Sequence, residues 1–197
     1  MYTLTLKTAP TVEPITAAEA ISYMRLSTLG TAETAYLTGL IKAAREYCER
    51  YQNRAYITQT WEMSLDEFPC DDSYIEIPKG KLQSITSVIY TDSAGTATTL
   101  TVNTDYIVSI RGIRGRISPP YGDIWPTASL WPLDPIVITF VCGYGDTAAT
   151  VPQTAIQAMY MLISYWWDNR SAAAETVPKE VEFAVKALLT PDRIVVV

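Results

Sequence analysis

The chain has 197 residues, a length that suits one domain with an insertion or two small domains. Of these residues, 48% are apolar, which is enough for a hydrophobic core. Its formal net charge of −6 argues against a surface that binds DNA by neutralising phosphates, but not against a protein that DNA merely passes. The sequence has no histidine, and its three cysteines form no Cys-x-x-Cys pair, so we expect no zinc site and no histidine-based catalysis. Without a signal peptide, these cysteines are expected to stay reduced and to serve as small apolar residues.

The N-terminal part predicts an extended arm followed by two helices. Residues 1–14 alternate like a strand and then contain two prolines. Thr16 and Glu19 have capping-box spacing and open a short helix to about Leu26. Apolar residues at i, i+3, i+4 and i+7 predict a longer helix from about Thr31 to about Gln52. The opposite face of that helix is charged, and we interpret it as solvated, with pairs at Lys42–Glu46 and Arg45–Glu49.

The hydrophobic period then changes from helical to alternating, which predicts an antiparallel β unit over residues 57–142. Residues 57–65 predict a half-buried strand with Trp61, Met63 and Leu65 on one face. Residues 136–142 (IVITFVC) are apolar on both faces and predict a central strand. The remaining predicted strands cover Tyr74–Pro78, Ser84–Thr91, Thr98–Val102, Asp105–Ile110 and Gly115–Ser118.

A loop over residues 121–135 carries two tryptophans, Trp125 and Trp131, each directly before a proline. The proline keeps the preceding residue extended. Two interpretations stay open at this point. The rings either fold over the sheet edge as a lid, or they bind a carbohydrate or a protein partner.

The stretch Val151–Arg170 (VPQTAIQAMYMLISYWWDNR) predicts a helix that is apolar around most of its circumference, with Thr150 as its N-cap. Such a helix must be covered on two sides, either by its own chain or by another copy of it. Its aromatic end is therefore a candidate subunit interface, formed by Tyr165, Trp166 and Trp167. Its apolar run is too short and too polar for a membrane span.

A last helix is expected from Pro178 to about Leu189, and the chain continues as an apolar tail over residues 191–197. An exposed run of β-branched residues favours pairing with the edge of a sheet, in this chain or in a partner. That run is Ile194, Val195, Val196 and Val197.

No motif in the sequence indicates catalysis. The phosphate-binding patterns GxxxxGK[ST] and GxGxxG are absent, and the acidic pair Asp71 and Asp72 is weak support for a hydrolase. A small basic cluster of Arg111, Arg114 and Arg116 stands beside glycines. It is either a solvated turn, a phosphate contact or a contact for an acidic patch on a neighbouring subunit. We therefore expect no catalytic residue, no metal, no cofactor and no enzyme activity.

These elements together predict an α+β fold. Its helical core of about four helices covers residues 15–56 and 143–190. An antiparallel β unit over residues 57–142 is inserted between the second and third helices, and the arm and the tail flank the core.

The chain has a family resemblance that rests on the order of its elements and on three stretches of sequence. These are the AAREYCERYQNRA–ITQTW junction, the GYGD turn and the WWDNR helix end. It resembles the head–tail connector (adaptor, or head-completion) proteins of long-tailed phages and gene transfer agents, in the branch with a β insertion. The resemblance implies a structural virion protein of the neck, made in the host cytoplasm, with no membrane association. It implies a ring, commonly of twelve copies, that lies below the portal, extends the DNA channel and docks the next tail or stopper component.

In this family the C-terminal segment often attaches to the portal, and the residues at that position here are those of the apolar tail. DNA is expected to pass through the ring without specific binding. The alternative function is a ligand-binding module, for a carbohydrate or a protein, that uses Trp125 and Trp131.

Overall fold

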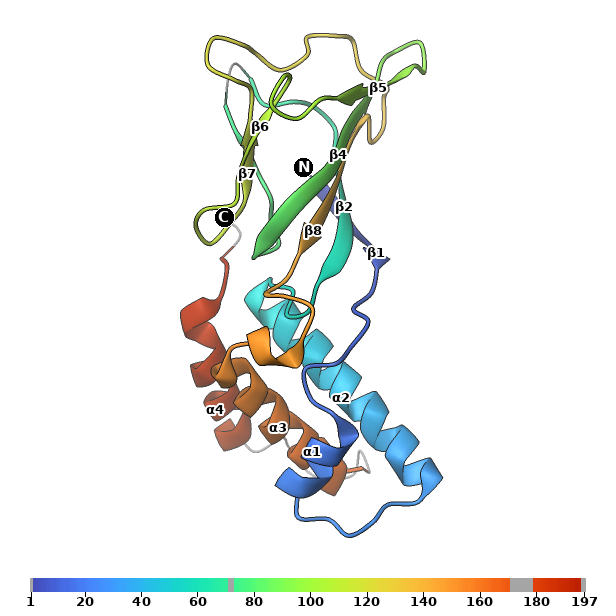
Figure 1. Cartoon of the computed structure of the whole chain (residues 1–197), viewed down its shortest axis with the longest axis vertical. Helices are drawn as coiled ribbons and strands as arrows, with labels where there is room; N and C mark the ends of the chain where they lie inside the picture. The colour runs from blue at the N-terminus through green and yellow to red at the C-terminus, as the bar shows by residue number, and fades with distance from the viewer. Residues whose placement is uncertain (1, 71–72, 171–178, 196–197) are drawn as a thin grey trace. The chain divides into compact units, whose positions relative to one another are not determined.

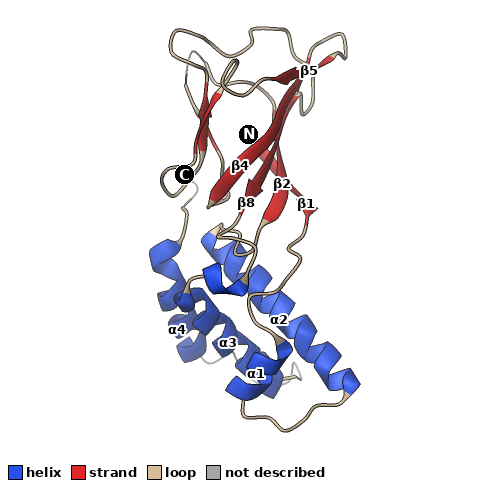
Figure 2. Cartoon of the chain, in the orientation of Figure 1, coloured by secondary structure: helices blue, strands red, loops and turns tan. Residues whose placement is uncertain are grey.

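The computed structural model describes residues 2–70, 73–170 and 179–195, which form two compact units (Figure 1). The β unit consists of Met1–Pro10 and Thr58–Gly143, and the helical unit consists of Thr11–Ile57 and Tyr144–Val197. Figure 2 shows helices in one unit and strands in the other. The predicted α+β class, with strands between the second and third helices, is confirmed.

The larger sheet of the β unit is antiparallel throughout and has the strand order β1-β2-β8-β4-β5. Its strands are β1 (Tyr2–Thr8), β2 (Gln59–Leu65), β8 (Ile136–Cys142), β4 (Leu82–Thr91) and β5 (Ala97–Leu100). The central place predicted for residues 136–142 is correct. Every second residue of β8 is buried, so this strand supplies the middle of the apolar face of the sheet.

The first strand of this sheet comes from the segment predicted as an extended arm. β1 pairs with β2 from Tyr2 opposite Leu65 to Thr8 opposite Thr60. The β unit is therefore not built from the inserted residues alone, because its edge strand precedes the first helix. A strand pairing of this kind joins residues far apart in sequence, and local periodicity does not reveal it.

A second, three-stranded sheet has the order β3-β7-β6, with β3 (Ile75–Glu76), β7 (Arg116–Ser118) and β6 (Ile107–Ser109). Gly115 enters β7 directly against β4. A Cβ atom at this position would lie 2.1 Å from Leu82 Cδ2, so only glycine allows the backbone to approach this closely.

The helical unit contains α1 (Ala17–Tyr23), α2 (Thr31–Gln52), α3 (Gln153–Asp168) and α4 (Lys179–Leu189). The predicted capping box is present, since Glu19 N–H donates to Thr16 Oγ1 and Thr16 N–H donates to Glu19 Oε2. Helix α2 begins at Thr31, as predicted, and its N-cap is Gly30. The predicted N-cap of α3 is wrong, because its cap is Pro152 and Thr150 instead closes a 3₁₀ turn (Ala148–Thr150).

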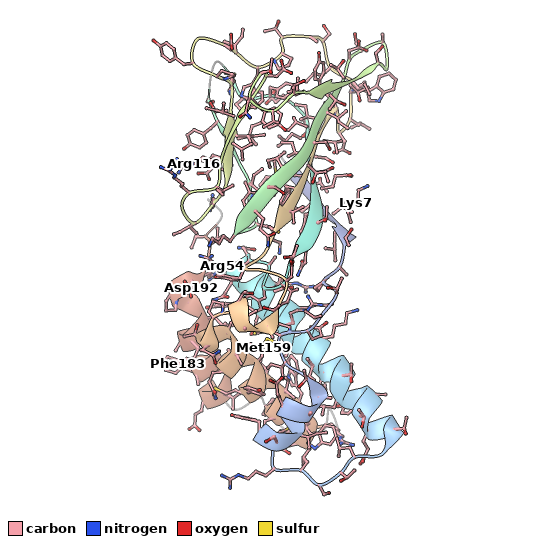
Figure 3. The ribbon with its side chains drawn as sticks, in the orientation of Figure 1. Lys7, Arg54, Arg116, Met159, Phe183 and Asp192 are labelled. Atoms are coloured by element: carbon pink, nitrogen blue, oxygen red, sulfur yellow. The ribbon has the colours of Figure 1, made fainter. Side chains whose placement is uncertain are left out.

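Helix α3 lies in the middle of the helical unit and contacts α1, α2 and α4. Met159, fully buried on α3, lies inside the unit in Figure 3. The two-sided apolar surface predicted for this helix is thus covered largely by its own chain. The buried residues of α3 are Ala155, Ala158, Met159, Leu162, Ile163 and Trp167.

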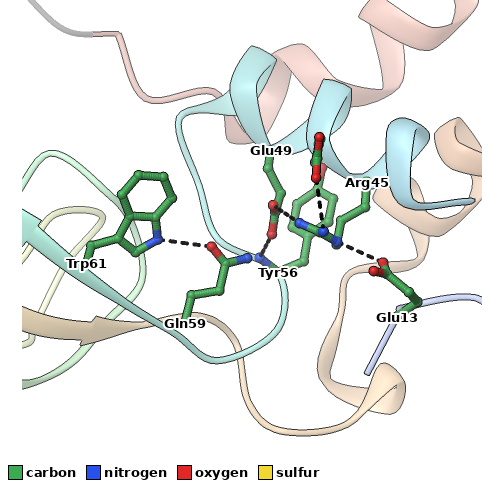
Figure 4. A network of polar contacts seen from close by, with 7 residues as sticks. Glu13, Arg45, Glu49, Tyr56, Gln59 and Trp61 are labelled. Atoms are coloured by element: carbon green, nitrogen blue, oxygen red, sulfur yellow. Dashed lines mark hydrogen bonds and ion pairs between the residues drawn. The ribbon is translucent and has the colours of Figure 1, made fainter. Parts of the chain in front are cut away.

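A buried ion-pair network joins three segments of the helical unit (Figure 4). Arg45 Nε lies 2.7 Å from Glu13 Oε2, and Arg45 Nη1 lies 2.7 Å from Glu49 Oε2. The other carboxylate oxygen of Glu49 accepts the backbone N–H of Tyr56 at 2.7 Å. Burial by itself would lower the pKa of Arg45, but the carboxylates of Glu13 and Glu49 outweigh it and raise that pKa.

The predicted solvated face of α2 is therefore wrong for the Arg45–Glu49 pair, although Lys42 and Glu46 are exposed. Arg45 lies four residues after the buried Ile41, and Glu49 lies eight residues after it. Both positions continue the apolar stripe of the helix, which is the signal that could have identified them.

Two cysteines act as buried apolar residues, and burial raises the pKa of the Cys48 thiol to about 12. Cys142 is also buried, whereas Cys70 is exposed. Within the described ranges, no helix is long and apolar enough to cross a membrane.

Trp167→Ala is expected to lower the free energy of unfolding by ~3–5 kcal/mol, because the ring is only 8% exposed and its loss leaves a cavity. Phe183→Ala is the matched control, since that ring is 75% exposed and its removal should change stability by less than ~0.5 kcal/mol. Urea unfolding of the isolated protein, followed by far-ultraviolet circular dichroism, measures both. Equal effects of the two substitutions would contradict the placement of Trp167 in the core.

Arg45→Met is expected to destabilise the protein by ~3–5 kcal/mol, because it leaves the buried carboxylate of Glu49 without its cation. Adding Glu49→Gln should restore part of this loss. Lys42→Met, at an exposed position of the same helix, should stay within ~0.5 kcal/mol of the unmodified protein. The same urea titration compares the three variants, and a neutral Arg45→Met would show that the network is not needed for stability.

Candidate interaction surfaces

The aromatic end of α3 mostly contacts its own chain. The Trp167 ring lies 5.9 Å from the Tyr36 ring, centroid to centroid, and the Arg170 guanidinium carbon lies 4.0 Å from the Trp167 centroid. The indole is therefore packed between an aromatic ring and a cation. Of the three residues predicted for a subunit interface, Trp167 is the one least accessible to another copy.

Trp166 and Tyr165 are half-buried, so part of each side chain faces solvent. The Trp166 ring meets the Tyr47 ring edge-on at 6.3 Å. Nearer the start of α3, the Tyr160 ring stacks on the Tyr23 ring of α1, with 4.5 Å between the ring centroids. Partly exposed aromatic side chains thus occur on α1, α2 and α3, and aromatic residues are typical of interface surfaces.

The basic cluster is partly neutralised within the β unit. Arg114 Nη1 lies 2.6 Å from Glu76 Oε2, and Arg116 Nε lies 3.5 Å from the other carboxylate oxygen of Glu76. The guanidinium carbon of Arg116 also lies 4.7 Å from the centroid of the Tyr74 ring. The structure thus brings Arg114 and Arg116 together at Glu76, which lies on β3. Arg111 is exposed.

The two loop tryptophans have different environments. Trp125 is buried, stacks on Phe68 at 5.2 Å with an interplanar angle of 10°, and donates its indole N–H to Ser73 O at 2.7 Å. Trp131 is exposed, and its backbone N–H donates to Thr91 O at 3.0 Å. A sugar groove of two exposed, parallel rings is therefore not formed by this pair.

The acidic pair Asp71 and Asp72 lies outside the described residues. In the parts of the chain that the structure describes, no group of three or more cysteine, aspartate or glutamate side chains could hold a metal ion.

The C-terminal tail begins inside the helical unit. Ile194 is 2% exposed, its N–H donates to Gln52 O at 2.9 Å, and its carbonyl oxygen accepts the Asn53 side-chain amide at 2.8 Å. Val195, the next residue, is 62% exposed. The other two residues predicted for portal binding, Val196 and Val197, lie outside the described residues.

The residues that hold this tail were not predicted from the sequence. Gln52 is buried, donates from Nε2 to Leu189 O at 2.7 Å and accepts the Tyr56 hydroxyl at 2.6 Å. Burial raises the pKa of that Tyr56 hydroxyl. The guanidinium of Arg54 donates to Asp192 O, and the two residues lie beside each other in Figure 3. Polar side chains at the end of an apolar helix are the available signal, but their partners lie far along the chain.

No family model and no curated protein matches the chain. Among solved structures, a chain of the neck of an empty GTA (gene transfer agent) particle, computed with C6 symmetry, is 26% identical with a TM-score of 0.78. That match covers 99% of this chain and 97% of the other. A chain of the virion of a native gene transfer agent particle is 25% identical with a TM-score of 0.78, covering 98% and 96% of the two chains.

A chain of the neck of a native GTA particle, computed with C12 symmetry, has a TM-score of 0.70 over 98% of this chain and 97% of the other. At 23% identity, this third match shows the shared fold. All three similar structures are virion or neck structures of one kind of particle. This chain is therefore a structural relative of chains in gene transfer agent necks and virions, which confirms the predicted resemblance, and those similar chains lie where this chain was predicted to lie.

Proposed function

We propose that the chain is a head–tail connector, or adaptor, that acts through protein–protein contacts and has no enzymatic role. Copies of it form a ring below the portal, which extends the DNA channel and docks the next tail or stopper component. The observation that carries this proposal is the match to a neck chain at a TM-score of 0.78 over nearly the full length of both chains.

A closed ring needs two different contact faces on each subunit. Large exposed apolar side chains occur on both units, so each unit offers apolar surface for contacts with other chains. In the helical unit they are Val12, Tyr23, Tyr36, Tyr47, Phe183 and Val195. In the β unit the most exposed are Ile113, Tyr121, Ile124 and Leu133. The C6 and C12 symmetries of the similar neck structures support assembly into a ring, and a ring of twelve copies is compatible with both.

The charge of the chain suits a DNA channel. Each copy carries a formal net charge of −6, so a ring repels phosphates and lets DNA pass without gripping it. Arg114 and Arg116 share Glu76, so one of their two positive charges is neutralised within the β unit. Arg111 remains available for an acidic patch on a neighbouring subunit.

The tail is the proposed attachment to the portal. Val195 is exposed directly after a buried residue, and it begins a run of β-branched residues suited to adding a strand to a sheet edge. Since Ile194 is already buried in the helical unit, attachment begins at Val195 rather than at Ile194.

Particles from a strain that lacks this gene should show filled or leaking heads beside separate, complete tails in electron micrographs. The physical reason is that the ring is the only joint between the two in this proposal. A strain with the gene restored on a plasmid is the control. Normally joined particles in the deletion strain would contradict the connector function.

Val195→Asp is expected to abolish attachment to portal rings while leaving the melting temperature within about 2 °C, because the side chain is 62% exposed. Val102→Asp is the matched control, since this valine is also exposed but lies in the β unit. Co-sedimentation with purified portal rings of the same particle measures attachment. Equal binding by the Val195→Asp variant and the unmodified protein would refute the tail contact.

A further inference from the structure

We propose that the last residue of α2 and the two residues after it form a clamp that fixes the point at which the chain leaves the helical unit and thereby positions the tail for its partner. The α2 clamp consists of Gln52, Asn53 and Arg54, which are positioning residues. The identity of the partner, the portal, rests on the proposed function, whereas the clamp itself rests on contacts within the chain.

The clamp holds the main chain of the C-terminal segment rather than its side chains. Its three side chains each donate a hydrogen bond to a different backbone carbonyl, and the backbone N–H of Ile194 returns one to Gln52 O. The three carbonyls accepting these bonds belong to Leu189, Asp192 and Ile194. Hydrogen bonds to the backbone at three points between Leu189 and Ile194 fix both the position and the direction of the segment.

The geometry of the helix end makes this grip possible. Asn53 has φ 54° and ψ 38°, the left-handed conformation that often ends a helix. Asparagine tolerates this conformation well, and its side-chain amide is left pointing away from the helical hydrogen bonds. That amide donates to Ile194 O at 2.8 Å.

Flanking contacts complete the hold on the segment. The Tyr51 hydroxyl lies 3.0 Å from Thr190 Oγ1, and the Arg193 guanidinium carbon lies 4.8 Å from the centroid of the Tyr51 ring. Side chains of four consecutive residues, the last two of α2 and the two that follow it, therefore contact the chain between Leu189 and Ile194.

The clamp ends abruptly, between a residue that is 2% exposed and one that is 62% exposed. Because one extended residue spans only ~3.5 Å, Val195 can move only a few ångströms from the point fixed by Ile194. A tail that starts from a fixed point loses less conformational entropy on binding than one that starts from a loose segment. The clamp thus favours attachment without touching the partner.

The substitution Asn53→Gly tests the clamp. Glycine adopts the same left-handed conformation, so the helix end is kept while the amide that holds Ile194 is removed. Losing one such hydrogen bond should speed hydrogen exchange of the Ile194 amide by roughly 3- to 10-fold. Attachment to portal rings should weaken by a similar factor, and the equilibrium constant for global unfolding should rise by no more than that factor, so the protein stays folded.

Asn169→Gly is the matched control. Its side-chain amide donates to Tyr165 O at 2.9 Å at the end of α3, a bond of the same type that does not involve the C-terminal segment. This variant should alter neither the exchange of the Ile194 amide nor portal attachment.

The outcomes separate the clamp from the proposed function. Unchanged exchange at Ile194 in Asn53→Gly would overturn the clamp. Suppose that Val195→Asp abolishes attachment. Faster exchange at Ile194 in Asn53→Gly, together with unchanged attachment of that variant, would then overturn the positioning role. If Val195→Asp itself leaves attachment intact, the tail contact of the proposed function fails and the positioning role fails with it, even where the exchange result shows the clamp. Faster exchange with weaker attachment, and neither effect in Asn169→Gly, supports the proposal.

Discussion

The buried charge of Arg45 is the constraint on which the helical unit depends. A guanidinium in a nearly dry site is costly unless carboxylates surround it, and here Glu13 and Glu49 do so at 2.7 Å each. One of these carboxylates precedes α1 and the other lies on α2 itself. The second also receives the backbone N–H of Tyr56, where the chain has left the helix. One cation therefore fixes the entry to the helical unit and the exit toward β2 to the same face of α2.

The same helix organises the C-terminal segment. Arg45 and Glu49 lie two turns and one turn before Gln52, respectively, and that glutamine links the Tyr56 hydroxyl to the carbonyl of Leu189. Helix α2 thus has a buried polar flank between Arg45 and Gln52, beside an apolar stripe that packs on α3. The apolar stripe supplies the area that stabilises the unit, and the polar flank decides which segments lie where.

The proposed connector role requires apolar surfaces that are exposed in the isolated chain and available to other subunits. The core is complete around Met159 and Trp167, yet aromatic side chains of α1 and α2 remain partly exposed, and so does Trp166. The β unit places exposed apolar side chains on its loops, while the arginines beside Glu76 are already paired. Such a distribution suits a subunit that is folded by itself and is covered further when copies and partners assemble.

The sequence by itself determined the elements whose signals are local. Spacings of a few residues predicted the capping box at Thr16, the span of α2 and the central strand Ile136–Cys142. The succession of these elements along the chain gave the resemblance to connectors. Only the tertiary structure decided the pairing of β1 with β2, the burial of Arg45 beside a carboxylate 32 residues away, and the hold of Asn53 on a carbonyl 141 residues away. It also decided that Trp125 is buried and Trp131 exposed, although both precede a proline. The physical reason is that periodicity tells which face of an element is apolar, whereas the partner of a polar side chain depends on how distant segments pack.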